Sequence, residues 1–255
     1  MLELLFAAAV ALGRLPAPEA RQGVAVDAAH VYAVDNSVIA KYDRRTGVKL
    51  AVFKGGRKKF RHTNACVVLD GELLCAVSNY PKTPMVSKVA VFDPGDLKLK
   101  RIIPLEGQPG SITWIDRYDG SWWAGFANYD GRGGVPGRDH RATVVVRFDD
   151  NWREEARWTF PPEVLARFAP YSNSGGAIGD DGRLYATGHN SRRLYVLEFP
   201  EDGEVLNLVA TIKVPVRGQA VTFDRTRDGV MYGVNRKTRE IVAFRLPAEI
   251  KWTAD

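Results

Sequence analysis

The sequence lacks two features that would point to a membrane protein or a helical protein: a long apolar run and a long segment of helical period. The apolar stretch from Leu4 to Leu12 is shorter than the about 20 residues that a membrane-spanning helix needs, and no other stretch could span a bilayer. A helical pattern occurs only in residues 161–170, PPEVLARFAP. We therefore expect no membrane span and a structure built mainly from strands.

The N-terminal apolar stretch leaves two interpretations open. Residues 1–9 are similar to the apolar region of a secretory signal, but Glu3 stands where such signals carry Lys or Arg. The stretch could equally belong to a native outer strand. A signal would send the protein to the periplasm or out of the cell, which is the expected location; without one the protein would be cytoplasmic.

The composition is that of one globular domain. The 255 residues are 45% hydrophobic and 26% charged, which is enough material for a full core. We expect a single domain over residues 10–250, followed by a tail at 251–255. The formal net charge of +6 is modest, so its meaning depends on where the charges lie.

Internal repeats dominate the pattern. Short strands rich in Val, Ile, Phe, Tyr and Trp are bounded by Asp-Gly and Asn turns, and they recur in five units that begin near residues 22, 64, 110, 175 and 219. Each unit contains four predicted antiparallel strands, except that the fifth unit stops after its third strand.

The missing strand has a candidate at the other end of the chain. VATIKVP (209–215) in the fourth unit and VALGRLP (10–16) near the N-terminus are alike, and each is followed by an Arg and a Gln. The match indicates that Val10–Pro16 is the outer strand of the last unit and closes a ring. We predict an all-β fold, a five-bladed β-propeller of four-stranded antiparallel blades, in which radial repetition leaves only short edges.

The repeats resemble the broad class of YVTN-like (YncE-like) and SMP-30-like propellers. The resemblance is clearest in YDRRTGVKL and VAVFDPGDLKLKRI, where the third strand turns through Asp and Gly into the fourth. It covers nearly the whole chain and rests on turn residues, so it implies an architecture and no particular function.

Such a propeller places the first strand of each blade nearest the axis and sorts the connections onto two faces. The face with the tight hairpin turns, called the bottom, collects acidic residues that we interpret as turn-forming. The opposite face, called the top, has few acids, namely Asp35, Glu106, Asp130 and Asp139. Its bases are Lys54, Arg57, Lys58, Lys59, Arg61, Lys82, Arg132, Arg138, Arg141, Arg192, Arg193, Arg217, Arg236 and Lys237. Unless these bases are merely solvated, the top face is expected to bind an anionic small molecule or an acidic saccharide.

Nucleic acid is not an expected partner. The long insertion of the third unit, NYDGRGGVPGRDHRA, has one aromatic residue and lacks the stacking platforms that single-strand binders use. We expect the protein to act as a monomer.

Two rings of polar residues are predicted to line the top of the channel. One ring lies where each first strand begins, and the other lies where each second strand ends with an Asn. With loop bases and tyrosines added, the predicted ligand-binding residues are Gln22, Arg61, Asn64, Asn79, Asn128, Tyr129, Tyr171, Asn173, Ser174, Asn190, Arg217 and Gln219. The alternative is a structural role, since Asn caps turns and Tyr anchors loops.

His62 and His189 are the predicted acid or base groups, with Tyr80 as a further proton donor. Imidazole titrates near neutral pH, and cationic neighbours would keep it unprotonated. No first strand begins with Asp or Glu, which argues against a two-carboxylate glycosidase. A lyase acting on a uronate, or a hydrolase, fits a base beside Arg or Lys better. The alternative is a non-catalytic ligand-binding or protein-interaction scaffold.

A metal site is a further hypothesis. His62, His140 and His189 are all expected to project from the top face and are candidates for a three-histidine site. The Asn ring offers oxygen ligands for Ca²⁺ but has no inward carboxylates. The cofactor therefore stays open, with a divalent metal as the candidate.

The two cysteines flank the Asp70-Gly71 hairpin turn. Counting outward from a two-residue turn places Cys66 opposite Cys75 in a non-hydrogen-bonded pair, a geometry that a disulfide can bridge. We predict that the two side chains are adjacent and that they form a disulfide if the protein is exported.

Overall fold

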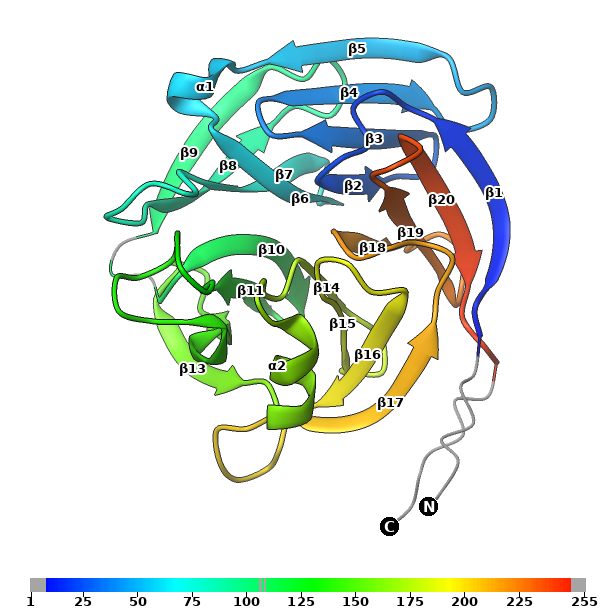
Figure 1. The fold of residues 1–255 in the computed structure, drawn as a ribbon. Coiled ribbons are helices and arrows are strands. Elements are labelled where there is room, and N and C mark those ends of the chain that lie inside the picture. Colours follow the sequence, from blue (N-terminus) through cyan, green and yellow to red (C-terminus); the bar gives the residue numbers. More distant parts are fainter. Residues whose placement is uncertain (1–7, 106, 108, 249–255) are drawn as a thin grey trace.

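The computed structural model describes residues 8–105, 107 and 109–248, and within them five four-stranded antiparallel sheets stand in a ring around a central axis (Figure 1). The predicted five-bladed β-propeller is therefore confirmed. Residues 1–7 of the predicted signal-like segment, the predicted tail and the top-face residue Glu106 lie outside the described residues.

The strands follow the predicted repeats in order. Blade 1 contains β2 (Gly23–Val26), β3 (His30–Asp35), β4 (Val38–Asp43) and β5 (Lys49–Lys54). Blade 2 contains β6 (His62–Leu69), β7 (Glu72–Ser78), β8 (Ser87–Phe92) and β9 (Leu99–Leu105). Blade 3 contains β10 (Ser111–Tyr118), β11 (Ser121–Ala127), β12 (Val144–Phe148) and β13 (Glu154–Thr159). Blade 4 contains β14 (Gly175–Ile178), β15 (Leu184–Thr187), β16 (Arg193–Glu198) and β17 (Asn207–Lys213). Blade 5 contains β18 (Val221–Phe223), β19 (Val230–Asn235), β20 (Glu240–Arg245) and the N-terminal strand β1 (Val10–Pro16).

The ring closes through the pairing of β1 with β20, as the repeat alignment predicts. The strands are antiparallel, with Val10 opposite Arg245 and Pro16 opposite Glu240. Figure 1 shows the first and last coloured strands of the chain side by side in blade 5. The N-terminal strand thus covers the edge that the last repeat would otherwise expose.

The core lies between neighbouring blades, so the inner strands are buried on both faces. β10 is buried over most of its length, and Trp114 within it is fully buried against blade 4. In the outer strands, more exposed and less exposed residues alternate, because one face of each strand is in contact with solvent. In β5 the exposed residues include Leu50 and Val52. This gradient explains why the inner strands read as continuous apolar runs in the sequence.

Small residues stand at the crowded axis for a steric reason. A Cβ on Gly23 would lie 2.2 Å from the Asn64 carbonyl oxygen, and a Cβ on Gly175 would lie 2.6 Å from the Gln219 carbonyl oxygen. No side chain fits at these distances. The backbones of the inner strands therefore converge at the axis. The polar residues next to these glycines, Asn64 and Gln219 among them, lie at the contacts between blades.

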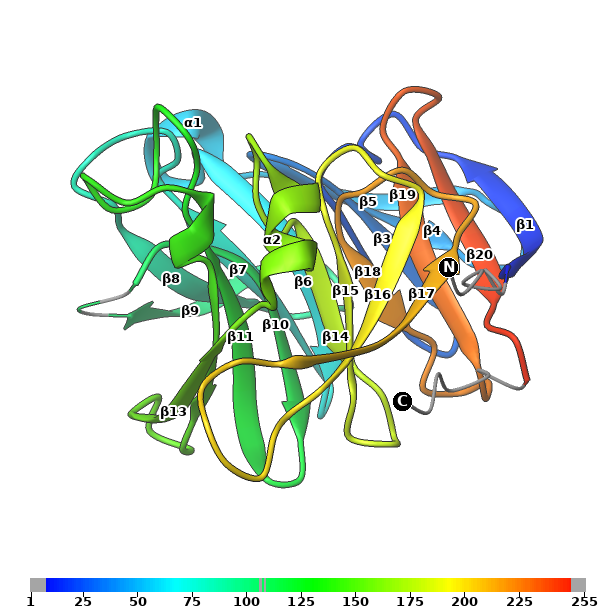
Figure 2. The ribbon, with the colours of Figure 1, turned by 60° about the horizontal axis from the view of Figure 1, so that its bottom comes forward.

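The two faces differ in their connections, as Figure 2 shows. The helices α1 (Gly56–Lys59) and α2 (Pro162–Phe168) and the 3₁₀ turn η1 (His140–Ala142) belong to the long connections of the top face. α2 confirms the helix predicted over 161–170. α1 is a helical turn that the sequence pattern did not predict, and it forms where the basic run folds back so that Phe60 donates its backbone N–H to Gly56.

The acids of the bottom face form turns, as predicted. Asp43 accepts hydrogen bonds from the backbone N–H groups of Arg45 and Thr46, and Asp93 accepts one from Gly95. Such side-chain turns fix the path between the third and fourth strands. None of the helices in the described part of the chain is long and apolar enough to span a bilayer.

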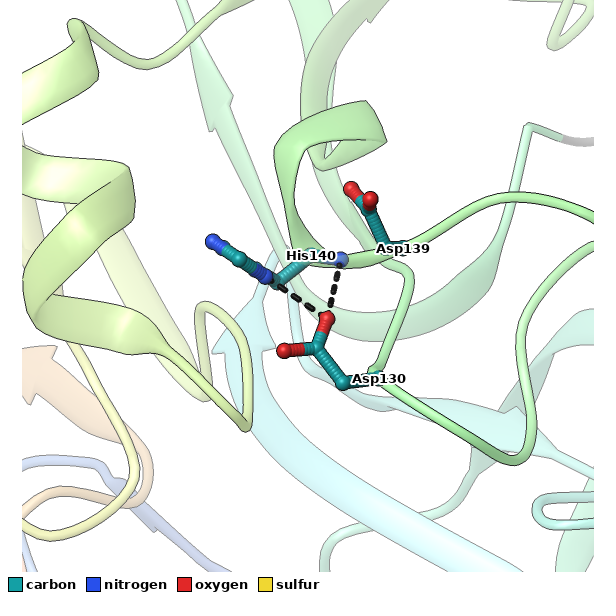
Figure 3. Close-up of side chains that lie close together, drawn as sticks. All are labelled: Asp130, Asp139 and His140. Carbon is teal, nitrogen blue, oxygen red and sulfur yellow. Dashed lines mark hydrogen bonds and ion pairs between the residues drawn. The ribbon is translucent and has the colours of Figure 1, made fainter.

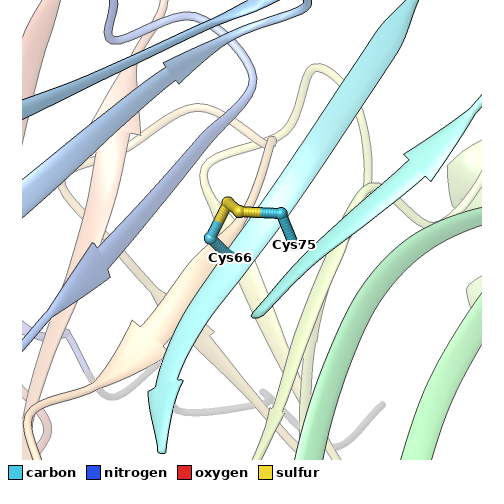
Figure 4. Close-up of a disulfide and its surroundings, with 2 residues drawn as sticks. All are labelled: Cys66 and Cys75. Atoms are coloured by element: carbon cyan, nitrogen blue, oxygen red, sulfur yellow. A yellow bond between two sulfur atoms is a disulfide. The ribbon is translucent and has the colours of Figure 1, made fainter. Parts of the chain in front are cut away.

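The cysteine pair has the predicted register. Cys66 on β6 lies opposite Cys75 on β7, with a Cα–Cα distance of 4.0 Å, and the two sulfur atoms form a disulfide (Figure 4). Both side chains are buried in the core between blades 1 and 2. The disulfide therefore ties the two innermost strands of blade 2 at the axis.

Removing the closing strand tests this architecture. A chain that lacks residues 1–16 leaves β20 without its outer partner, and we expect its melting temperature to fall by about 10–20 °C, because several backbone hydrogen bonds of about 1 kcal/mol each are lost. A circular permutant in which residues 8–16 follow residue 248 through a short Gly-Ser linker keeps the strand and should melt within a few degrees of the full chain. Equal melting of the truncated and full chains would contradict closure by β1.

Candidate functional site

A cavity of about 330 Å³ opens on the top face where blades 4, 5 and 1 meet. It is lined by Arg21, His189, Asn190, Arg217, Gln219, Asn235, Arg236, Lys237 and Arg239. Asn235 is the last residue of β19, and the others come from four separate connections: β1–β2, β15–β16, β17–β18 and β19–β20. The cavity therefore exists only because the ring closes.

The β17–β18 connection packs closely against blade 4, because two of its residues have positive φ angles. Gly218 has φ +59°, and a Cβ there would lie 2.1 Å from the His189 carbonyl oxygen. The next residue, Gln219, is buried with φ +63°, an uncommon conformation for a residue with a side chain. This close approach fixes Arg217 beside His189.

Positive charge in the cavity is only partly balanced. The Asp35 carboxylate lies 3.5 Å from Arg21 and 3.6 Å from Arg239, so one acid serves two bases. Among the described residues, Arg217, Arg236 and Lys237 form no ion pair with a carboxylate. The cavity is thus a basic pocket with unbalanced charge.

Arg236 lies at the centre of this charge. Burial lowers the pKa of its guanidinium, and the positive charge of Arg21 lowers it further. The Nε atom of Arg21 is itself buried without a hydrogen-bond partner in the described structure. Like charges held together with unsatisfied donors are stabilised by an anion that accepts from them.

His189 presents an unprotonated nitrogen toward this charge. Its Nδ1 lies 2.9 Å from the Asn190 Oδ1, which can only accept, so Nδ1 carries the proton and Nε2 has the lone pair. Nε2 lies 3.5 Å from Nη1 of Arg236. Burial lowers the pKa of His189, and Arg236 lowers it further, while the Asn190 contact opposes the shift. His189 is therefore a free base at neutral pH.

His62 makes the same kind of contact with an Asn side chain and also lies within the influence of the Arg236 charge. Its Nδ1 lies 2.8 Å from Asn36 Oδ1, and Asn36 donates from Nδ2 to Asp35 at 2.8 Å. Burial first, and then Arg236 and His189, lower the pKa of His62 to about 4. His62 does not line the cavity, but it contributes a second neutral imidazole to the same electrostatic unit.

The aromatic residues divide into two stacks. Tyr171 stacks on His189 with ring centroids 4.1 Å apart and remains 40% exposed, so its outer face is open. Tyr80 lies between His62 and Tyr129, with centroid distances of 5.1 and 4.6 Å. Burial raises the pKa of Tyr129. None of these three tyrosines lines the cavity, but Tyr171 is adjacent to it through its stack on the lining residue His189.

The structure brings part of the predicted ligand set to the cavity. His189, Asn190, Arg217 and Gln219 line it. Gln22 lies next to this group, because its carbonyl oxygen accepts from the backbone N–H of Ala220, the residue after Gln219. These residues come from repeats 1, 4 and 5.

Other predicted residues of the polar rings instead hold the fold together. Asn64 donates to the Ile112 carbonyl, Asn79 donates to the Pro84 carbonyl, and Asn128 donates to the Pro109 and Ala142 carbonyls. Asn173 accepts from the Trp114 indole N–H at 2.7 Å. The side-chain amides of these residues form hydrogen bonds within the protein. This is the structural role that the sequence analysis gave as the alternative to ligand binding.

Ser174 and Arg61 also lie outside the cavity lining. Ser174 donates its backbone N–H to the Thr187 carbonyl, which fixes the start of β14. Arg61 is half-buried immediately before β6.

The three predicted metal-binding histidines do not come together. His140 lies in the blade 3 insertion, where its Nδ1 is 2.7 Å from Asp130 (Figure 3). Within the described residues, the one group of three potential ligand side chains is Asp130, Asp139 and His140, and it contains neither His62 nor His189. The group of potential ligands around His140 thus consists of residues from the blade 3 insertion, and the three-histidine site stays a prediction.

A ring of Asn ligands for Ca²⁺ is not assembled either. The Oδ1 atoms of Asn79 and Asn128 accept hydrogen bonds from the backbone N–H groups of Val86 and Val135. Asn190 Oδ1 faces His189. These oxygens are committed to loops, so the donor set does not suit a central cation.

The sequence analysis did not include Arg239. It placed Asp35 among the top-face acids, Asn36 and Asn235 in the general Asn ring, and Arg236 among the top-face bases, and it assigned none of them to the site. One signal was available: HNSRR (189–193) and NRKTR (235–239) occupy the same turn in consecutive repeats. Their alignment brings Arg236 near His189. The Asp35 contacts depend on ring closure and have no local pattern.

The larger cavity of the described structure, about 1010 Å³, lies on the bottom face between blades 4 and 5. Most of its charged side chains are paired: Asp224 accepts from Arg44 and Arg227, and Arg225 donates to the buried Asp116. Arg245 donates to the backbone carbonyl of Asp228. The Asp224–Arg44 pair joins blades 5 and 1, and the Asp116–Arg225 pair joins blades 3 and 5. The bottom cavity is therefore a structural crevice, whereas the top cavity has unbalanced groups.

Comparison with known proteins supports the fold. No known family profile matches the chain, and no curated protein does. A luciferin-regenerating enzyme is 11% identical with a TM-score of 0.50, over 98% of this chain and 95% of that one. A gluconolactonase from Xanthomonas campestris is 14% identical with a TM-score of 0.52, over 88% and 71%. Hydrazine synthase from Kuenenia stuttgartiensis is 11% identical with a TM-score of 0.54, over 89% and 84%. The first two confirm the resemblance to SMP-30-like propellers, at the level of the fold alone.

Titration of the histidines tests the electrostatics of the pocket. Because Arg236 lowers the pKa of both His62 and His189, replacing it by Gln should raise both values, which NMR titration of the imidazole signals can follow. His62 should stay neutral until about pH 4 in the native chain. Arg57→Gln, a change on the exposed α1, should move neither value. Unchanged titration in Arg236→Gln would refute the coupling.

Proposed function

We propose that this propeller binds an anionic small molecule or an acidic saccharide in the basic pocket of its top face and acts on it as a lyase or hydrolase. The observation that carries the proposal is the set of three bases without carboxylate partners beside His189, whose Nε2 is unprotonated. Anion recognition and a free base then occupy one site.

The chemistry that suits this arrangement is removal of a proton next to a carboxylate. The Arg236 guanidinium holds the substrate carboxylate, which offsets the charge that develops when the neighbouring carbon loses its proton. His189 Nε2 takes that proton. In a uronate, the electron pair forms a carbon–carbon double bond, the glycosidic C–O bond breaks, and the leaving oxygen takes a proton from water.

Tyr171 gives the substrate ring a place to lie. Its inner face stacks on His189, and its outer face is open to solvent. A sugar ring on that face would stand close to Nε2 while its acidic group reaches Arg236. His62 contributes by keeping the surroundings neutral and desolvated on the side of blade 2.

The expected location outside the cytoplasm is part of the proposal. The disulfide between Cys66 and Cys75 supports it, because disulfides persist in oxidising compartments such as the periplasm or the extracellular space. We also propose that the chain acts as a monomer.

One observation favours a non-catalytic binding function as the second candidate. Asp35, the acid nearest the cavity, is held by Arg21 and Arg239. No lining residue of the pocket is an acid that could protonate a leaving group. Binding without turnover is the outcome that this alternative predicts.

Two single substitutions separate binding from catalysis on a polygalacturonate substrate. His189→Ala should lower kcat by about 100-fold or more with little change in affinity, because it removes the base alone. Arg236→Gln should weaken binding by about tenfold, because a charge-assisted contact is lost. Release of unsaturated product measures turnover, and calorimetry measures affinity.

His140→Ala serves as the matched control, since this histidine is tied to Asp130 in the blade 3 insertion and lies outside the pocket. Turnover that survives in His189→Ala would refute the catalytic assignment. Binding by the native chain without any turnover would favour the second candidate.

A further inference from the structure

The charge of the basic pocket indicates more than a preference for anions. We propose that its ligand carries at least two negative charges close to one another, either as a phosphate group or as two acidic groups of one saccharide. This inference rests on the proposed function and defines the ligand class of the same site.

The first step is the charge balance. Five bases line the cavity, and the acid in contact with them is Asp35, which pairs with Arg21 and Arg239. His189 is neutral, for the reasons given above. An excess of four positive charges remains, so a ligand with a single negative charge would leave most of it unbalanced.

The second step is the position of the unbalanced charge. Arg217, Arg236 and Lys237 come from two neighbouring connections and have no carboxylate partner among the described residues. Arg236 is half-buried, and the Nε atom of Arg21 is buried without an acceptor. The pocket thus combines a buried donor that lacks an acceptor with three bases that lack carboxylate partners, and more than one oxyanion contact would satisfy them.

The third step is size. A volume of about 330 Å³ lies at the lower end of the range for small-molecule sites. A phosphate group can meet several of these bases within the cavity. A saccharide with two acidic groups would have to place one group in the cavity and extend over the open face of Tyr171. The phosphate group and the saccharide both carry two negative charges. They differ in that only the saccharide would contact Tyr171.

Calorimetric titration of the full chain with three probes tests the inference. The probes are inorganic phosphate, digalacturonate and galacturonate, at constant ionic strength and about pH 8, where phosphate is a dianion. We expect phosphate, digalacturonate or both to bind at least about tenfold more tightly than galacturonate. Arg236→Gln should reduce that preference to less than about threefold, while Arg57→Gln on α1 should keep it.

Tyr171→Ala identifies the source. Tighter binding of digalacturonate than of phosphate by the native chain, lost in Tyr171→Ala, supports the saccharide. Tighter binding of phosphate than of digalacturonate by the native chain, unchanged in Tyr171→Ala, supports the phosphate group. Galacturonate binding as tightly as both other probes would overturn the double charge while leaving the anion site intact. If no probe binds the native chain more tightly than Arg236→Gln, at equal melting temperatures of the two chains, the proposed anion site itself is refuted.

Discussion

Closure of the ring by the pairing of β1 with β20 is the constraint on which the rest of the structure depends. The pairing places the first residues after β1 against the turn between β19 and β20: Ala17 donates its backbone N–H to the Arg239 carbonyl, and the Arg239 side chain donates to the Pro18 carbonyl. Residues more than 200 positions apart in sequence thereby share one surface. The basic pocket lies at this junction, so its charge is assembled by the same contacts that close the fold.

The two faces of the propeller differ in how their arginines are paired with carboxylates. On the bottom, buried carboxylates such as Asp116 and Asp224 pair with arginines from other blades, and these pairs join the blades. On the top, Arg217 and Arg236 have no such partners in the described structure. Holding bases together without acids costs stability, and this arrangement beside a neutral imidazole is the observation on which the proposed anion site rests.

Much of the fold could be predicted because it follows from local chemistry. Asp and Gly at the hairpin turns set the strand limits, and counting from the Asp70-Gly71 turn gave the correct register of Cys66 and Cys75. The similarity of VALGRLP to VATIKVP identified the closing strand, since both must cover the outer edge of a blade. These signals act over a few residues or repeat along the chain.

The site could be predicted only in part, because equivalent positions in the repeats have different surroundings. Asn79 and Asn128 occupy the same repeat position as Asn190, yet they bind their own loops, whereas Asn190 orients His189. Tyr80 is covered by the insertion, since a Cβ on Gly133 would lie 2.4 Å from its ring. Such differences arise from contacts between distant connections, and no repeat pattern encodes them.

The central claim is that the unbalanced bases at the closing junction bind an anion. A crystal structure of the chain grown with saturating galacturonate tests it most directly. We predict that the sugar carboxylate lies within hydrogen-bond distance of the Arg236 guanidinium, with the ring near Tyr171. A ligand bound only in the bottom cavity, or a top pocket without ligand at that concentration, would contradict the claim.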